Sequence, residues 1–287
     1  MEININNISM RKTKLLLLAL VLTAIPNFIW AYTKDQIVSF DNEQTHYQVI
    51  QPDGETGKDP TVRFISTKKA GHFEIPSTVS KGDGVTFTVV EVGSISGYTS
   101  TNLTSVTLPS TIKVIGINSF SGATKLESIN IPANVETINP IAFGDLRTVP
   151  VFTVDPANSH FSSDANGVLY SKDKKTLYNV PTAIAEKINS NTYTVDPAVT
   201  KINRGAFPAH AKLTKVILPE GLETVEQVYP PIATTNTLKE FEIASGNPTF
   251  KVDGGVLFDK TKKELVCYPR AKADTDYKVP DEFTSIG

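Results

Sequence analysis

The amino-acid sequence predicts a mainly β solenoid of coils of about 23 residues, with short parallel strands, β-hairpin insertions and a β-rich N-terminal cap. Three observations lead to this fold class. A short segment with alternating apolar residues recurs at a constant offset, and its proline and phenylalanine keep the same place in each copy. A longer segment occurs twice, with its two copies 88 residues apart. Self-similarity at a fixed period of 20–50 residues is the signature of repeat architectures.

The short repeat is clearest when residues 103–109 are aligned with residues 126–132, an offset of 23. The same offset carries Phe120 to Phe143, and further copies begin at Leu213 and Leu238. A β-sandwich with regular strand spacing is the alternative. It would repeat the alternation of apolar and polar residues but would not keep phenylalanine and proline in phase, so the repeat favours the solenoid.

The spacing within one copy predicts the path of a coil. Residues 105–108 alternate between polar and apolar, as expected of a short half-buried strand. Pro109 cannot donate to a strand ladder, so the chain turns there. Ile112 and Ile115 then point inward, and Phe120 fills the middle of the coil. Stacking such coils at about 4.8 Å per step buries their apolar faces continuously.

The longer repeat predicts hairpins inserted into two coils. Residues 166–170 (NGVLY) recur as residues 254–258 (GGVLF), and the segment around Lys174 recurs around Lys262. Asn-Gly and Gly-Gly between strand-like runs are typical of tight hairpin turns. The neighbouring lysines, at 172–175 and 260–263, are expected to be solvated tips or edge protection.

The N-terminus has the pattern of a secretory signal peptide. A basic segment at 10–14 precedes an apolar run at 15–25, and a polar stretch begins after Ala31. The run is too short for a stable membrane span, and cleavage is expected after Ala31. We therefore predict a signal peptide at 1–31, a β cap at 32–72 and a solenoid at 73–287, with either Met1 or Met10 as the start. The mature chain should have no transmembrane span and be secreted or held at the cell surface.

The chain ends at Gly287 where a coil should continue, so we expect the repeat to be truncated there or the natural protein to be longer.

Composition argues against several classes of function. A formal net charge of −2 makes nucleic acid an unfavourable partner. The single cysteine, Cys267, excludes a disulfide framework and a multi-thiolate metal site, and its apolar neighbours predict a buried thiol. The four histidines fall in no recognisable catalytic or metal-binding motif. We therefore predict no catalytic residues, no bound metal and no cofactor.

Two segments superficially resemble sites. His160 lies near Asp155 and Asp164 in sequence, but no activated serine accompanies them. Residues 162–173 loosely resemble a calcium loop, although its first and last ligand positions carry the wrong residues. A hairpin turn explains this segment and its copy near Gly255 equally well.

The repeat unit resembles that of the BspA-like leucine-rich-repeat family of bacterial and protist surface proteins. The resemblance rests on residues 103–109 (LTSVTLP), on Ile115-Gly116 leading to Phe120, and on Ile138 leading to Ala142-Phe143. It covers roughly residues 73–287. Residues 96–98 (SGY) and 229–231 (YPP) depart from the pattern, which predicts irregular coils there. The resemblance implies adhesion to host proteins or other cells, without fixed catalytic residues.

If the solenoid binds a partner, the outward-facing strand positions are the candidate surface, because repeat solenoids present such extended rows to large ligands. These positions are Ser105, Thr107, Ser128, Asn130, Val151, Thr153, Lys215, Ile217, Glu240 and Glu242. The leading hypothesis is an exported binding module for an extracellular protein or glycan. The alternatives are a structural spacer in a larger surface protein and an exported glycan-processing enzyme.

Overall fold

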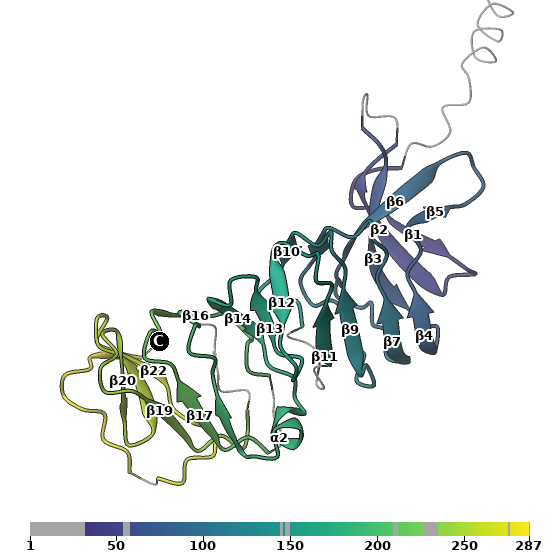
Figure 1. The fold of residues 1–287 in the computed structure, drawn as a ribbon. Coiled ribbons are helices and arrows are strands. Elements are labelled where there is room, and N and C mark those ends of the chain that lie inside the picture. The colour runs from purple at the N-terminus through teal and green to yellow at the C-terminus, as the bar shows by residue number, and fades with distance from the viewer. Residues whose placement is uncertain are drawn as a thin grey trace, which may run out of the picture.

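The protein is an elongated β solenoid in the computed structural model, which describes residues 32–53, 58–143, 146, 150–208, 212–226, 235–274 and 276–286 (Figure 1). The predicted signal peptide, the irregular segment at 229–231 and Gly287 lie outside these residues. Strands dominate the described part, which also contains the short helix α2 (Ile184–Lys187). The predicted fold class is confirmed.

One side of the solenoid is formed by the first strand of each coil. Sheet B contains β4 (Gly71–Glu74), β7 (Leu103–Thr107), β9 (Ser128–Ile131) and β11 (Val151–Val154), all parallel. Sheet D continues along the chain with β15 (Thr192–Thr194), β17 (Lys215–Leu218) and β19 (Glu240–Ile243). The 23-residue offset is visible in the pairing, since Val106 lies beside Ile129 and Ile129 beside Phe152.

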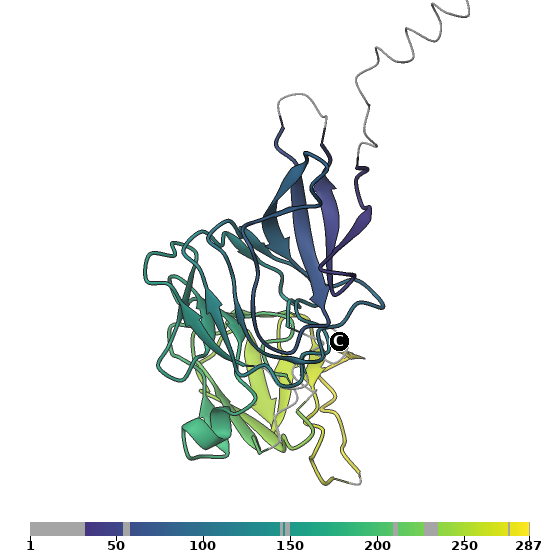
Figure 2. The same cartoon turned by 90° about the vertical axis from the view of Figure 1, so that its right-hand side faces the viewer.

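The cap and the first coils share sheet A. Its strands β1 (Ile37–Phe40), β2 (Thr45–Gln51) and β3 (Thr61–Thr67) continue into β6 (Thr86–Val92), β8 (Val114–Ile115) and β10 (Thr137–Ile138), while β5 (Thr78–Ser80) pairs with β6. The boundary proposed at residue 72 falls inside β4. Figure 2 shows the purple and blue cap strands rising above the first coils.

The two predicted hairpins lie in sheets C and E. Sheet C contains β12 (Phe161–Ser163), β13 (Leu169–Ser171), β14 (Thr176–Asn179), β16 (Lys201–Ile202) and β18 (Thr224–Val225). Sheet E contains β20 (Phe250–Asp253), β21 (Val256–Asp259), β22 (Glu264–Cys267) and β23 (Ser285–Ile286). Asp253 pairs with Val256, so Gly254 and Gly255 form a two-residue turn with both φ angles positive. The first hairpin has a wider loop, between Ser163 and Leu169.

The core runs along the axis of the solenoid. Val106, Ile112 and Ile115 are at most 5% exposed, as the alternation predicted. Phe120, Phe143 and Phe207 are buried in their respective coils, and Cys267 is buried as expected. Each coil thus covers the apolar side chains of its neighbours, which stabilises the stack by removing apolar surface from water.

Each hairpin tip covers the last strand of the sheet before it. The backbone N–H of Phe152 in β11 donates to the carbonyl of Gly167 at 3.1 Å, and the N–H of Phe241 in β19 donates to that of Gly255 at 2.9 Å. A Cβ atom on Gly167 would lie 2.2 Å from the Val151 side chain. The glycines therefore permit a close approach that ends sheets B and D.

One buried asparagine joins each hairpin to the coil before it. The Asn158 side-chain amide donates to the carbonyls of Pro132 and Val135, at 2.9 and 3.0 Å, and its oxygen accepts from the backbone N–H groups of His160 and Phe161, both at 2.8 Å. Asn247 makes the equivalent four bonds in the second hairpin. Each side chain satisfies all its hydrogen-bonding groups while buried.

No helix in the described part of the chain is long and apolar enough to cross a membrane.

Candidate functional site

The face of sheet B brings six of the predicted surface residues together. Val106 pairs with Ile129, so Ser105 lies beside Ser128, and the register of β9 with β11 then places Ser128 beside Val151. The second row runs parallel to the first, through Thr107, Asn130 and Thr153. Ser105 and Val151 are half-buried, and the other four are exposed.

The sheet B face extends further than the sequence indicated, because β4 adds His72 and Glu74 to the two rows. The His72 ring contacts the hydroxyl of Ser105 at 2.8 Å and that of Thr107 at 3.4 Å. On the other side, the Thr153 hydroxyl donates to the Asn130 amide oxygen at 3.2 Å. Both added side chains are exposed. They could have been found from the alternation in residues 71–75, where Phe73 and Ile75 point inward.

The sheet D face carries the remaining four predicted residues in a charged setting. The Lys215 amine lies 2.6 Å from Glu242 and 3.3 Å from Glu240. Hydrogen bonds to these carboxylates, first to Glu242 and then to Glu240, raise the pKa of Lys215. Ile217 lies beside Glu242, and β15 adds Thr192 and Thr194 to the rows. The 23-residue offset from Lys215 could have revealed those two threonines.

The ten predicted residues lie on two sheets and do not form one row. Sheets B and D have no strand pairing with each other. The hairpin tip at Gly167 lies against β11, at the edge where the next coil would otherwise pair. The stacking of parallel first strands resumes after α2, with β15 of sheet D. The hairpin insertion therefore divides the strand surface into two separate faces (Figure 1).

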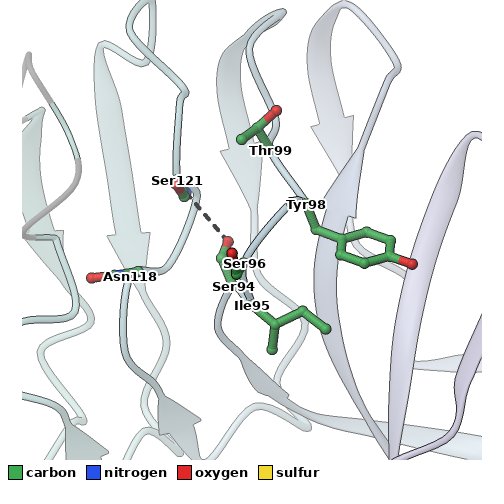
Figure 3. Close-up of a pocket in the computed structure, with 8 residues that line it drawn as sticks. Ser94, Ile95, Ser96, Tyr98, Thr99, Asn118 and Ser121 are labelled. Atoms are coloured by element: carbon green, nitrogen blue, oxygen red, sulfur yellow. Dashed lines mark hydrogen bonds between the residues drawn. The ribbon is translucent and has the colours of Figure 1, made fainter.

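A polar pocket lies at the irregular coil around Gly97, where other coils have their phenylalanine. It has a volume of about 300 Å³ and is lined by residues 94–99 with Asn118 and Ser121. Figure 3 shows Tyr98 directed away from the pocket, and the Ser121 N–H donates to the Ser94 hydroxyl at 3.4 Å. The Tyr98 ring instead meets His46, with ring centroids 4.9 Å apart. The pKa of His46 is lowered, mainly because its ring is partly removed from water.

A second pocket, of about 500 Å³, adjoins the strands of sheet B. Thr104, Lys125, Glu127, Val151 and Thr182 contribute to its lining. Among the described lining residues Glu127 carries a carboxylate, whereas glycoside hydrolysis uses two carboxyl groups flanking the bond. The described lining of this pocket therefore does not supply the acid pair of a glycosidase.

The segments that superficially resembled sites have structural roles. The Asp164 carboxylate accepts the backbone N–H groups of Asn166 and Val168, both at 2.9 Å, and so closes the hairpin loop. His160 is exposed, and its ring lies against Phe161. Within the described ranges, no group of three His, Cys, Asp or Glu side chains is arranged to hold a metal ion.

Solved structures that this chain resembles come from bacterial proteins. The pneumococcal vaccine antigen PcpA is 18% identical, with 75% of this chain and 72% of that chain covered and a TM-score of 0.42. A leucine-rich cell surface protein from Faecalibacterium prausnitzii is 16% identical, with coverage of 89% and 84% and a TM-score of 0.39. A leucine-rich-repeat protein from T. pallidum is 20% identical, with coverage of 72% and 78% and a TM-score of 0.36. No protein of curated function matches the chain.

The family match covers the solenoid itself. The BspA type leucine-rich repeat region matches six copies, in residues 91–165 and 174–252, which together hold more than half of the chain. The matched segments include the strands of both faces from β7 onward. The chain therefore belongs to the BspA-type leucine-rich-repeat family.

Proposed function

We propose that the chain is an exported binding protein, secreted or held at the cell surface, and that the face of sheet B contacts an extracellular protein or glycan. The observation that carries this proposal is the set of aligned polar side chains on four neighbouring parallel strands. The family membership supports an interaction role, and the N-terminal pattern supports export.

The side chains of the sheet B face suit recognition by hydrogen bonding. Serine, threonine and asparagine lose little side-chain entropy when a partner orders them, compared with lysine or glutamate. Their hydroxyl and amide groups offer both donors and acceptors. Val151 adds an apolar contact within the same row. A partner with an extended row of polar groups would match this surface.

Sheet D is less suited to the same role. Lys215 already pairs with two carboxylates, and a partner would have to replace these contacts or accommodate them. Desolvating such ion pairs costs free energy that a new interface must offset. The serine, threonine and asparagine side chains of sheet B are uncharged and carry no such cost, so we assign the primary contact to them.

Binding can be tested with the exported chain against immobilised extracellular-matrix proteins and surface glycans. Saturable binding to one of them is expected. For that partner, Asn130→Arg should weaken binding at least about tenfold, because an unpaired charge enters the contact. Thr137→Arg is the matched control, since Thr137 is an exposed strand residue of the same coil but lies in sheet A.

Three outcomes separate the parts of the proposal. Loss of binding in Asn130→Arg alone supports the sheet B face. Equal binding by both variants would place the contact elsewhere on the molecule. No saturable binding to any of the immobilised ligands would contradict the binding function itself.

A further inference from the structure

Tyr32 is held to the cap by three contacts. Its backbone nitrogen lies 2.8 Å from the Asp53 carboxylate, and its hydroxyl donates to the Asp83 carboxylate. Its ring packs edge-on against Phe87, with centroids 4.9 Å apart at 84°. These contacts bridge 21 to 55 positions of sequence, from Asp53 after β2 to Phe87 in β6. One residue thereby joins three separate segments of the cap.

The surroundings of Tyr32 are partly buried and acidic. Tyr32, Asp53 and Asp83 are each half-buried, and Phe87 is 1% exposed. Burial, together with the hydrogen bond to Asp83, raises the pKa of Tyr32 to about 12. The ion pairs found among the described residues give Asp53 no lysine or arginine partner.

Tyr32 is also the residue that would follow the expected cleavage after Ala31. That expectation came from the basic segment, the apolar run and the small residue before a polar stretch. The nitrogen that this cleavage would free as an amine is the one that contacts Asp53.

We propose that a signal peptidase hydrolyses the Ala31–Tyr32 bond and that the new α-ammonium group of Tyr32 forms an ion pair with Asp53. Water supplies the hydroxyl that completes the Ala31 carboxyl group and the hydrogen that goes to the Tyr32 nitrogen. The amine then takes up a proton from the solvent at neutral pH. This inference rests on the export proposed above.

Cleavage strengthens the contact between the Tyr32 nitrogen and the Asp53 carboxylate, and the two groups keep their positions. Before cleavage, the Tyr32 amide offers Asp53 one neutral N–H donor. After cleavage, the ammonium group offers up to three donors and a positive charge at the same 2.8 Å separation. Processing would therefore tighten the attachment of the N-terminus to the cap at the moment the leader is removed.

The cleavage position can be measured on the full chain expressed in a bacterium that exports it. Intact mass and N-terminal sequencing of the exported protein should both give a chain that begins at Tyr32. Export with a different first residue would overturn this inference and leave the proposed export intact. Retention of the chain inside the cell with the leader attached would contradict both.

The ion pair can be measured by amine labelling of the same exported protein. The Tyr32 α-amine should react with an acylating reagent more slowly than in an Asp53→Asn variant, because the paired ammonium must first dissociate and lose its proton. We expect pairing to slow labelling by roughly twofold to fivefold, the range of ion pairs near the protein surface. Lys34, which is exposed, serves as an internal reference in the same labelling reaction.

Asp59→Asn is the matched control, because it removes one exposed carboxylate near Asp53 in sequence. We expect the ratio of Tyr32 to Lys34 labelling to rise in Asp53→Asn and to stay at the wild-type value in Asp59→Asn. A ratio that is equal in all three proteins would overturn the ion pair, even with cleavage at Tyr32. Circular dichroism checks that each variant is folded, so that a change in the labelling ratio does not arise from unfolding.

Discussion

Replacing Gly167 with alanine should destabilise the protein far more than an ordinary turn mutation. Gly167 has φ +76°, a conformation that costs alanine about 1–2 kcal/mol. An added Cβ would lie 2.2 Å from the Val151 side chain and 3.1 Å from the Phe152 nitrogen. Relieving this overlap requires the hairpin or β11 to move, at about 1–3 kcal/mol.

The shift would also weaken a hydrogen bond. The Phe152 N–H donates to the Gly167 carbonyl at 3.1 Å, a contact worth about 0.5–1.5 kcal/mol. We therefore expect Gly167→Ala to reduce the free energy of unfolding by about 3–6 kcal/mol. Gly82→Ala is the matched control, since Gly82 has φ +79° and open space where its Cβ would lie. It should cost only about 1–2 kcal/mol.

The assay is urea unfolding followed by circular dichroism, with hydrogen exchange of the β11 peptide as a local measurement. Gly167→Ala should lower the urea midpoint more than Gly82→Ala and should accelerate exchange at Phe152. Equal midpoints for the two variants would refute the reasoning, because the difference between them depends only on the close approach to β11.

Two further predictions concern the buried polar groups. Asn158→Ala should lower the free energy of unfolding by about 2–4 kcal/mol, because four backbone groups lose their partner; urea unfolding measures this, and a cost no larger than that of the exposed Asn130→Ala would contradict it. Burial raises the pKa of Tyr170 to about 12, so the folded state favours its neutral phenol. This contribution to stability is complete below the ordinary tyrosine pKa of about 10 and is lost as the pH rises towards about 12. Tyrosinate absorbance should show part of the tyrosine titration well above pH 10, and a single transition near pH 10 for all tyrosines would argue against the prediction.

The sequence predicted the coil from local patterns alone. Alternation at residues 105–108 indicated which side chains face inward, and Val106 and Leu108 are indeed buried. The constant offset predicted the register, which Val106 and Ile129 confirm. Both follow from the strand period of two and from the need of each coil to bury its apolar side against the next.

The candidate surface was predicted less completely. The alternation identified Ser105 and Thr107 as outward-facing, yet His72 and Glu74 were missed because the first coil departs from the repeat. The candidate surface was also described without the hairpin tip at Gly167, whose position depends on how a hairpin folds back onto an earlier strand. Such contacts join residues that share no local pattern.

By itself, the sequence determined the period, the inward-facing residues, the hairpin insertions and the family, because repetition and alternation are local properties of a chain. Only the tertiary structure showed that Gly167 and Gly255 close the strand faces, that Asn158 joins two coils and that Tyr32 meets Asp53. Those features depend on which distant backbone and side-chain groups come within hydrogen-bonding distance once the coils are stacked.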